Sequence, residues 1–236
     1  MITIGLLYPG HSAEDDFAVA GERYVGDLRL PLVHTAMASD AHRPDELRAW
    51  GAADALAAGA QELVAHDPAA IVWTCTSGSF VFGWDGARRQ ADQLAEQSGR
   101  PVSSTSLAFA RAAGALGVGR VAVAASYPDD VAQLFVDFLS QAGISVTAFG
   151  ASDILYASDV GRLDPQQVIE LVTSVDNSDA DAVLVPDTAM HTLGVIDDLE
   201  NLIGKPVLTA NQVSVWEGLR LAGAARSADG LGRLFA

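Results

Sequence analysis

The single cysteine of the chain lies where a reactive thiol could act on a ligand. Cys75 follows the apolar run Ala70–Thr74 and precedes Thr76–Ser79, a stretch of small hydroxyl side chains and one glycine. Backbone N–H groups at such a turn can bind an anion, and a nearby partial positive charge lowers a thiol pKa, which would give a thiolate nucleophile or base. The alternative is that Cys75 is a small buried hydrophobic residue, since free cysteines are among the most buried residues.

A carboxylate occupies the corresponding position in the second half of the chain. Asp187 follows the apolar run Ala182–Pro186 and is followed by Thr188, so both halves end a strand with an ionisable side chain and then a hydroxyl. Asp187 could be a general acid or base, or it could cap the next helix, for which aspartate is well suited. His191, expected in the first turn of that helix, could bind a carboxylate or titrate near neutral pH, or be a partly exposed helix residue.

Three further segments place polar groups after predicted strands. Tyr127 could donate a hydrogen bond to a developing oxyanion, or it could pack over its loop as an ordinary aromatic residue. The loop that begins at Pro9 and ends at Ser12 follows the first strand and could supply N–H groups to a ligand. Asn211 follows the last strand, where its amide could reach a cleft or cap the final helix.

The elements that position these residues follow an alternating pattern. Short β-rich apolar runs alternate with Ala-rich segments of helical periodicity, which is typical of βαβ units in a parallel sheet. The predicted strands are Ile2–Tyr8, Leu30–Thr35, Ala70–Thr74, Pro101–Ser103, Val121–Ala125, Ser145–Phe149, Ala182–Pro186 and Pro206–Leu208. The predicted helices are Ala13–Val25, Asp45–Ala65, Asp85–Gln97, Leu107–Leu116, Pro128–Ala142, Pro165–Ser174, Met190–Leu202 and Val213–Leu221.

The strands fall into two sets of four, which predicts an α/β fold of two similar lobes, each a four-stranded parallel sheet flanked by helices. We expect the first lobe to comprise residues 1–105 and 211–236 and the second lobe residues 106–210. Ligands of open parallel sheets bind beyond the carboxyl ends of the strands. A cleft between the lobes would therefore present Cys75 and Asp187 to opposite sides of a small ligand.

The amino-acid composition argues against some classes of binding partner. The 236 residues are enough for one large domain or two small ones, and the formal net charge of −16 opposes binding to nucleic acid or to an anionic membrane surface. No apolar stretch approaches the ~20 residues needed to cross a bilayer, and the N-terminus resembles a strand and not a signal peptide, so we expect a cytoplasmic protein.

The same composition speaks against bound metals and disulfides. One cysteine cannot form an intramolecular disulfide, and neither paired cysteines nor a close His–Glu spacing suggests a metal site, so no metal or other cofactor is expected. The acidic runs Glu14–Asp16 and Asp176–Asp181 are expected to be solvated surface.

Motifs along almost the whole chain resemble the Asp/Glu racemase superfamily, in the branch that contains maleate cis-trans isomerases and arylmalonate decarboxylases. The matching elements are Gly5–Pro9, Thr74–Gly78, Ala115–Ala122 leading to Tyr127, Val160–Pro165, Asp187–Thr188, Gly204–Gln212 and Trp216. The resemblance implies two lobes related by a pseudo-twofold axis, and a cleft that binds a small carboxylate without a metal or organic cofactor.

The resemblance also implies roles for individual residues. The first strand-end position is a cysteine in the isomerases and racemases, as Cys75 is here, whereas the second is a cysteine in the isomerases, the decarboxylases and most racemases and is Asp187 here. Thr76, Ser77 and Tyr127 match decarboxylase positions that bind a substrate carboxylate. With one thiol retained and the second absent, nucleophilic addition is favoured over deprotonation.

We therefore expect a cofactor-independent enzyme that acts on a small carboxylate or dicarboxylate and is most like a maleate cis-trans isomerase. Cys75 would be the nucleophile and Asp187 an acid or base partner. The expected substrate-binding residues are Pro9, Ser12, Thr76, Ser77, Tyr127, Thr188, His191 and Asn211. A decarboxylase-like or racemase-like enzyme using the same pocket is one alternative, and a noncatalytic carboxylate-binding protein is another. A homodimer would follow the commonest pattern of assembly.

Overall fold

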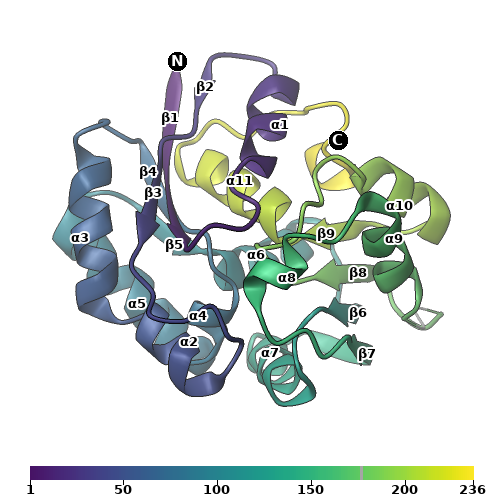
Figure 1. Ribbon diagram of the computed structural model, residues 1–236. Coiled ribbons are helices and arrows are strands. Elements are labelled where there is room, and N and C mark those ends of the chain that lie inside the picture. The colour runs from purple at the N-terminus through teal and green to yellow at the C-terminus, as the bar shows by residue number, and fades with distance from the viewer. Residues whose placement is uncertain (176–177) are drawn as a thin grey trace.

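The computed structural model describes residues 1–175 and 178–236, and it contains two parallel sheets with helices around them (Figure 1). Residues 176 and 177, at the start of the second acidic run, lie outside the described residues. The strands are β1 (Ile2–Pro9), β2 (Leu28–Arg29), β3 (Leu32–Thr35), β4 (Ala70–Trp73), β5 (Val102–Ser104), β6 (Arg120–Ala125), β7 (Ser145–Ala151), β8 (Ala182–Val185) and β9 (Val207–Thr209).

The two sheets share one strand order. The first runs β2-β1-β4-β5, with β3 also paired to β1, and the second runs β7-β6-β8-β9; every pairing is parallel. In the first sheet β1 lies between β2 and β4, and in the second sheet β6 lies in the equivalent place between β7 and β8. The predicted two-lobed α/β fold is confirmed, with one correction: the short β2 makes the first sheet five-stranded instead of four-stranded.

The helices largely follow the predicted positions, and most boundaries differ by a few residues. They are α1 (Asp16–Arg23), α2 (Pro44–Trp50), α3 (Ala53–Val64), α4 (Ser77–Phe80), α5 (Gly83–Ser98), α6 (Thr105–Ala115), α7 (Asp129–Gln141), α8 (Ala157–Val160), α9 (Pro165–Thr173), α10 (Ile196–Ile203), α11 (Ala210–Leu221) and the 3-10 helix η1 (Arg233–Phe235). The short helices α4, α8 and η1 were not predicted from periodicity, which needs a longer segment to be visible.

The predicted helix over residues 45–65 is two helices, because the chain turns at Gly51. A β-carbon at Gly51 would lie 2.1 Å from the carbonyl oxygen of Gly78, and the Gln90 side chain donates to the carbonyl oxygens of both glycines. Gly51 thus packs α2 directly against the segment that follows Cys75. The helical periodicity of the apolar residues continues across Gly51, so the sequence pattern did not reveal the break between the two helices.

The lobes share a hydrophobic core. The larger cluster of buried apolar side chains takes members from both sheets, such as Val72 of β4 and Leu184 of β8. Helices α6 and α11 occupy equivalent places, each directly after the last strand of its sheet, and they pack together, with Thr105 Oγ1 2.7 Å from Ser214 Oγ. Because the core is continuous, the lobe boundaries at 105/106 and 210/211 stay a prediction.

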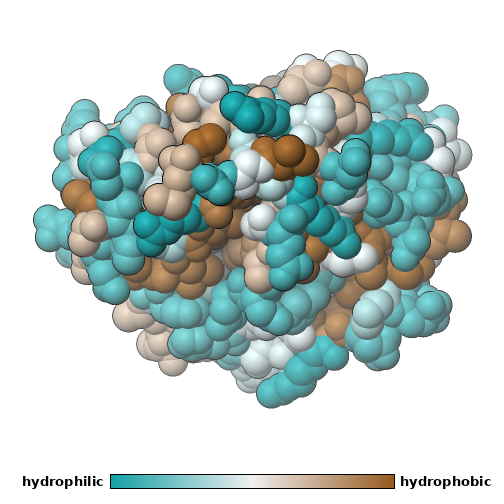
Figure 2. Space-filling model, turned by 90° about the horizontal axis from the view of Figure 1, so that it is seen from above, coloured by the Kyte–Doolittle hydropathy of each residue, from teal (hydrophilic) through white to brown (hydrophobic). Residues whose placement is uncertain are grey.

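The surface mixes hydrophilic and hydrophobic side chains, and from above, hydrophobic side chains reach the surface around a hollow near the middle of the face (Figure 2). Among the described residues, we find no helix with both the length and the hydropathy to cross a bilayer. One acidic residue departs from the expected solvated surface: Asp16 is 4% exposed.

Candidate active site

Segments at and after the carboxyl ends of five strands, β1, β3, β4, β7 and β8, enclose a narrow cavity between the lobes. Its open volume is only about 10 Å³, so the side chains nearly close it. The first lobe supplies Tyr8, Pro9, Ser12, Met37, His42, Trp50, Cys75 and Ser77, and the second supplies Ala157, Asp187, Thr188 and Ala189. The predicted opposition of Cys75 and Asp187 in one cleft is therefore present. A larger depression over α2, α3 and α5 has no cysteine, histidine or carboxylate among its described lining residues.

Cys75 lies at the bottom of the turn between β4 and α4 and is only 2% exposed. Its Sγ accepts a hydrogen bond from the Gly78 backbone N–H at 3.2 Å, and the Ser77 hydroxyl lies 3.7 Å away. A β-carbon at Gly78 would lie 3.1 Å from this sulfur, so the glycine leaves room for it. The sequence predicted several backbone N–H donors around the thiol, and in the structure the Gly78 N–H donates to Sγ.

Those donors do not make Cys75 a resting thiolate. Burial, with a smaller contribution from the negative charge of Asp187, raises the pKa of Cys75 to about 12, although the hydrogen bonds from Gly78 and Ser77 lower it. The expectation of a lowered thiol pKa is wrong. The thiol is protonated at neutral pH, so any nucleophilic step must first remove its proton.

Asp187 is fixed by hydrogen bonds from its own lobe. Its Oδ1 accepts from the backbone N–H of Ala189 at 2.9 Å, and its Oδ2 accepts from the Ser126 hydroxyl. Asp187 is not the cap of the next helix, because α10 begins only at Ile196 and its capping position is Val195. The predicted capping of that helix is therefore wrong, and the acid or base role stays a prediction.

The hydroxyl groups of Thr76, Ser77 and Tyr127 lie near the thiol. Burial raises the pKa of Tyr127 well above its ordinary value, with the charges of Asp187 and Cys75 adding to the effect, and the nearby hydroxyls of Thr76 and Ser77 oppose it. The Tyr127 hydroxyl donates to the carbonyl oxygen of Pro186, so in this state it is not directed at a ligand. The Thr76 hydroxyl is buried and has no partner in hydrogen-bond geometry.

Four predicted binding residues are not among those that line the cavity: Thr76, Tyr127, His191 and Asn211. His191 precedes α10 and does not belong to its first turn, and its Nε2 lies 2.8 Å from the exposed carboxylate of Asp15. Asn211 lies inside α11, which is capped by Thr209 and not by Asn211. The Asn211 amide donates to the buried carboxylate of Asp16 at 2.9 Å, which also accepts from the Thr192 and Leu193 backbone.

Sequence reasoning missed residues that the fold brings to the cavity. His42 is 3% exposed, its Nε2 lies 3.9 Å from Asp187 Oδ2, and its ring packs against Tyr127 with centroids 4.8 Å apart. His42 lies in the loop after β3, which shows no helical or strand periodicity. Its position after a predicted strand was the one sequence feature that could have indicated a site residue. The Tyr8 hydroxyl accepts from the Ala13 N–H and donates to the Thr188 carbonyl, which joins the two lobes across the cavity.

The protonated thiol gives a direct prediction for alkylation by a neutral reagent such as iodoacetamide. Only the thiolate reacts, so the rate at Cys75 should rise about tenfold per pH unit from pH ~7 to ~10 without reaching a plateau. The same chain unfolded in urea is the control, because its thiol should titrate near the ordinary value of ~8.5. A plateau below pH ~9 in the folded protein would contradict the raised pKa.

Fold and site together define an interlobe cavity enzyme of the α/β class, with one thiol and one carboxylate at equivalent strand ends. Residues 50–235 match the profile of the arylmalonate decarboxylase family, and the chain belongs to that family. The arylmalonate decarboxylase of Bordetella bronchiseptica is 28% identical over 236 residues, which cover 99% of this chain and 96% of that enzyme. The resemblance found in the sequence is thereby confirmed.

Two solved structures are similar to the chain over almost its whole length. A cysteine-to-serine variant of the Nocardia farcinica maleate cis-trans isomerase, with a covalently bound succinylcysteine intermediate, has a TM-score of 0.90 at 25% identity and covers 99% of this chain and 98% of its own. An arylmalonate decarboxylase variant in which a glycine became cysteine and a cysteine became serine has a TM-score of 0.87 at 27% identity, covering 100% and 99%. The chain is an enzyme of this isomerase and decarboxylase group.

Proposed function

We propose that the protein is a cis-trans isomerase of a small unsaturated carboxylate, with Cys75 as the nucleophile. The observation that carries the proposal is the position of the thiol: it lines the cavity between the lobes, receives one backbone hydrogen bond, and has a carboxylate on the opposite wall. A relative with the same fold forms a succinylcysteine intermediate, which is the product expected when a thiol adds to a four-carbon unsaturated diacid.

The proposed reaction begins with proton removal, because Cys75 is protonated at rest. Asp187 accepts the thiol proton, and Sγ adds to the alkene carbon next to a substrate carboxylate, so that an S–C bond forms while the π bond breaks. The proton then passes to the other alkene carbon, giving a saturated thioether. Rotation about the former double bond and the reverse elimination release the trans isomer and restore both side chains, with no net oxidation or reduction.

The proposed carboxylate pocket lies on the first lobe. The buried Thr76 hydroxyl lacks a partner, and an unsatisfied buried polar group costs ~1–3 kcal/mol, so a ligand that accepts its hydrogen bond would recover that free energy. Ser77 and Ser12 add hydroxyls to the wall, and Thr188 adds one from the second lobe. Tyr127 can join this pocket only if its hydroxyl leaves the Pro186 carbonyl.

Two of the sequence predictions change in this proposal. His191 and Asn211 act on the loop before α10 and not on the substrate. The side chain of His191 contacts the Asp15 carboxylate, and the side chain of Asn211 donates to the Asp16 carboxylate. They are therefore proposed as positioning residues. A small carboxylate is the proposed partner, and a homodimer and a cytoplasmic location stay predictions.

A second candidate function is decarboxylation of an α-acidic malonate with Cys75 as the proton donor. The raised thiol pKa favours it, because a thiol that stays protonated can deliver its proton to the carbanion left after carbon dioxide departs. The full-length similarity to an arylmalonate decarboxylase supports the same reading.

Product analysis in heavy water separates these functions. The protein is incubated with maleate and, separately, with phenylmalonate, and products are identified by NMR. Trans alkene from maleate is the expected result. Carbon dioxide and an α-deuterated arylacetate from phenylmalonate would establish the decarboxylase instead. Deuterium exchange at the α-carbon of an amino acid would indicate a racemase, and no turnover across a panel of such acids would leave a carboxylate-binding protein.

A further inference from the structure

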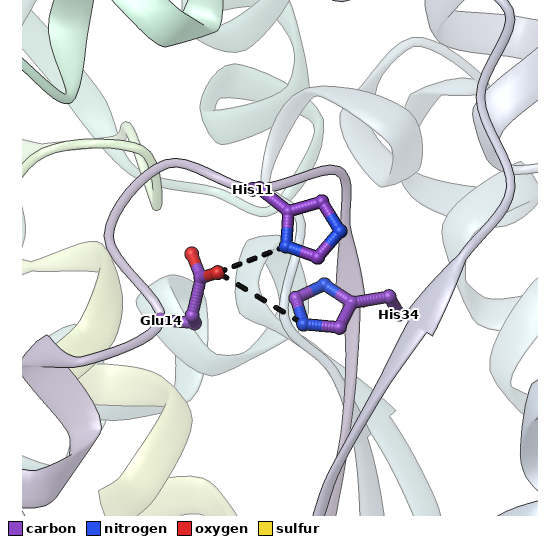
Figure 3. Close-up of side chains that lie close together, drawn as sticks. All are labelled: His11, Glu14 and His34. Atoms are coloured by element: carbon purple, nitrogen blue, oxygen red, sulfur yellow. Dashed lines mark hydrogen bonds and ion pairs between the residues drawn. The ribbon is translucent and has the colours of Figure 1, made fainter.

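A second cluster of titratable side chains lies just outside the cavity, at the carboxyl end of β1. His11 and Glu14 belong to the loop between β1 and α1, and His34 belongs to β3 (Figure 3). The ligand atoms of the three side chains all lie within 4.8 Å of one another, and both imidazole rings face the same carboxylate. The sequence predicted no metal site, since it shows neither paired cysteines nor a close His–Glu spacing. His34 comes near His11 and Glu14 through the pairing of β1 with β3.

The hydrogen bonds of His34 leave a lone pair directed at the cluster. His34 Nδ1 lies 2.5 Å from the carbonyl oxygen of Gly10, which can only accept, so Nδ1 carries the hydrogen of this bond. In the neutral ring, Nε2 then has a free lone pair, and it lies 3.9 Å from Oε1 of Glu14, which is also an acceptor. Two acceptors that face one another are stabilised by a cation between them, either a proton on the ring or a metal ion.

The remaining contacts orient the other two side chains toward the same point. His11 Nδ1 lies 3.1 Å from Glu14 Oε1, and the imidazole rings of His11 and His34 pack with centroids 3.9 Å apart and planes tilted by 33°. Glu14 Oε2 accepts from the backbone N–H of Ser12 at 2.8 Å, which leaves Oε1 for the cluster. A carbonyl partner on the second nitrogen of a histidine and an N–H on the second oxygen of a carboxylate are the outer contacts that metal ligands usually have.

We propose that His11, Glu14 and His34 bind one divalent transition-metal ion, with Zn²⁺ the best match to two imidazoles and one carboxylate. Such a site has three protein ligands and a fourth position for water. The three side chains are 74%, 30% and 33% exposed respectively, so an ion can enter from solvent. The net charge of −16 raises the local concentration of cations without selecting among them.

Metal binding at this point would act on the active-site wall. Pro9 and Ser12, which flank His11 in the sequence, line the cavity, and the Tyr8 ring packs edge-on against His34 with centroids 6.1 Å apart. An ion that joins the loop to β3 would hold Pro9 and Ser12 in place. This inference does not depend on which reaction Cys75 catalyses.

Isothermal titration with Zn²⁺ tests the proposal on the full chain. We expect one ion per protein, binding about 100-fold weaker in His34→Ala and in His11→Ala, and a melting temperature that Zn²⁺ raises in the wild type but not in these variants. His66→Ala, which removes an exposed histidine outside the cluster, and Cys75→Ala, which removes the thiol that Zn²⁺ could otherwise bind, should both keep wild-type affinity.

Other outcomes overturn the proposal. Absence of stoichiometric binding in the wild type would mean that Glu14 and the histidines form an ordinary surface ion pair. Equal loss of affinity in His66→Ala would mean diffuse attraction to the acidic surface, and loss in Cys75→Ala would place the ion at the thiol. Circular dichroism of each variant confirms that it is folded, and the exposure of His11 and His34 makes unfolding unexpected.

Discussion

Replacing Cys75 with alanine is expected to lower kcat by about 10⁴-fold or more while the protein stays folded. The thiol is the sole cysteine of the chain, and both candidate reactions use it, as nucleophile or as proton donor. Removing one buried sulfur costs only ~1 kcal/mol of unfolding free energy, which a folded domain tolerates. Cys75→Ser should be nearly as inactive, because a hydroxyl of similar shape is a far weaker nucleophile and acid.

Ser214→Ala provides the matched control for this variant. Ser214 is buried like Cys75, and its hydroxyl lies between α11 and α6, where it donates to the Ala210 carbonyl and meets Thr105. Its removal should cost a comparable ~1 kcal/mol without touching the cavity. Urea unfolding and steady-state kinetics on both variants separate the two effects: retention of even a tenth of wild-type kcat in Cys75→Ala would contradict the assigned role.

Asp187→Asn is expected to lower kcat by about 10²–10⁴-fold, the range associated with loss of a positioned acid or base. The amide keeps the shape of the side chain: its oxygen can accept from the Ala189 N–H, and its NH2 group can donate to the Ser126 hydroxyl, which can also accept. The substitution should also make the thiol more acidic. Burial is the main cause of the raised Cys75 pKa and stays in this variant. The negative charge of Asp187, which also raises the pKa, is removed, so the alkylation profile should move to lower pH.

This pairing of effects distinguishes Asp187 from a purely structural residue. A more reactive thiol together with slower turnover means that the carboxylate moves a proton and does not merely support the fold. Asp181→Asn is the control, because Asp181 is an exposed carboxylate that pairs with Arg120 away from the cavity, and we expect it to leave both kcat and the alkylation profile unchanged. Turnover within threefold of wild type in Asp187→Asn would exclude the proton-transfer role.

The sequence correctly predicted the positions of residues that come directly after buried strands. Runs such as Ala70–Trp73 and Ala182–Val185 are continuous apolar segments of strand length, and parallel sheets bring their carboxyl ends to one edge. Cys75 and Asp187 therefore follow equivalent strands of the two sheets. The family resemblance added the expected pocket, and the cavity contains Pro9, Ser12, Ser77 and Thr188.

Tertiary contacts account for the site details that local pattern could not predict. The helix expected from Met190 begins only at Ile196, because the Thr192 and Leu193 backbone N–H groups donate to the Asp16 carboxylate, 176 and 177 residues away, instead of to helical carbonyls. The same contact buries Asp16 within an acidic run that looks solvated in the sequence. Burial of Asp16 raises its pKa, against the hydrogen bonds from Asn211 and the loop.

The raised pKa of Cys75 has the same kind of origin. The sequence around the thiol shows hydroxyls and a glycine, which suggest activation, but the pKa depends on how completely the lobes enclose the sulfur and on the charge of the opposite wall. Both depend on residues more than a hundred positions away in the chain. His42 reaches Asp187 in the same way, through a loop whose place is set by contacts with residues 154 and 155 of the second lobe.

The central claim is that Cys75 forms a covalent bond to the substrate during turnover, and peptide mass spectrometry of acid-quenched reactions tests it most directly. Wild type and Asp187→Asn are mixed with maleate and quenched at intervals. The account predicts that the peptide containing Cys75 gains the mass of one maleic acid in the wild type and more slowly in Asp187→Asn, where the proton acceptor is missing, and that Cys75→Ala gains none. Conversion of substrate to product while this peptide keeps its unmodified mass at every interval would contradict the claim.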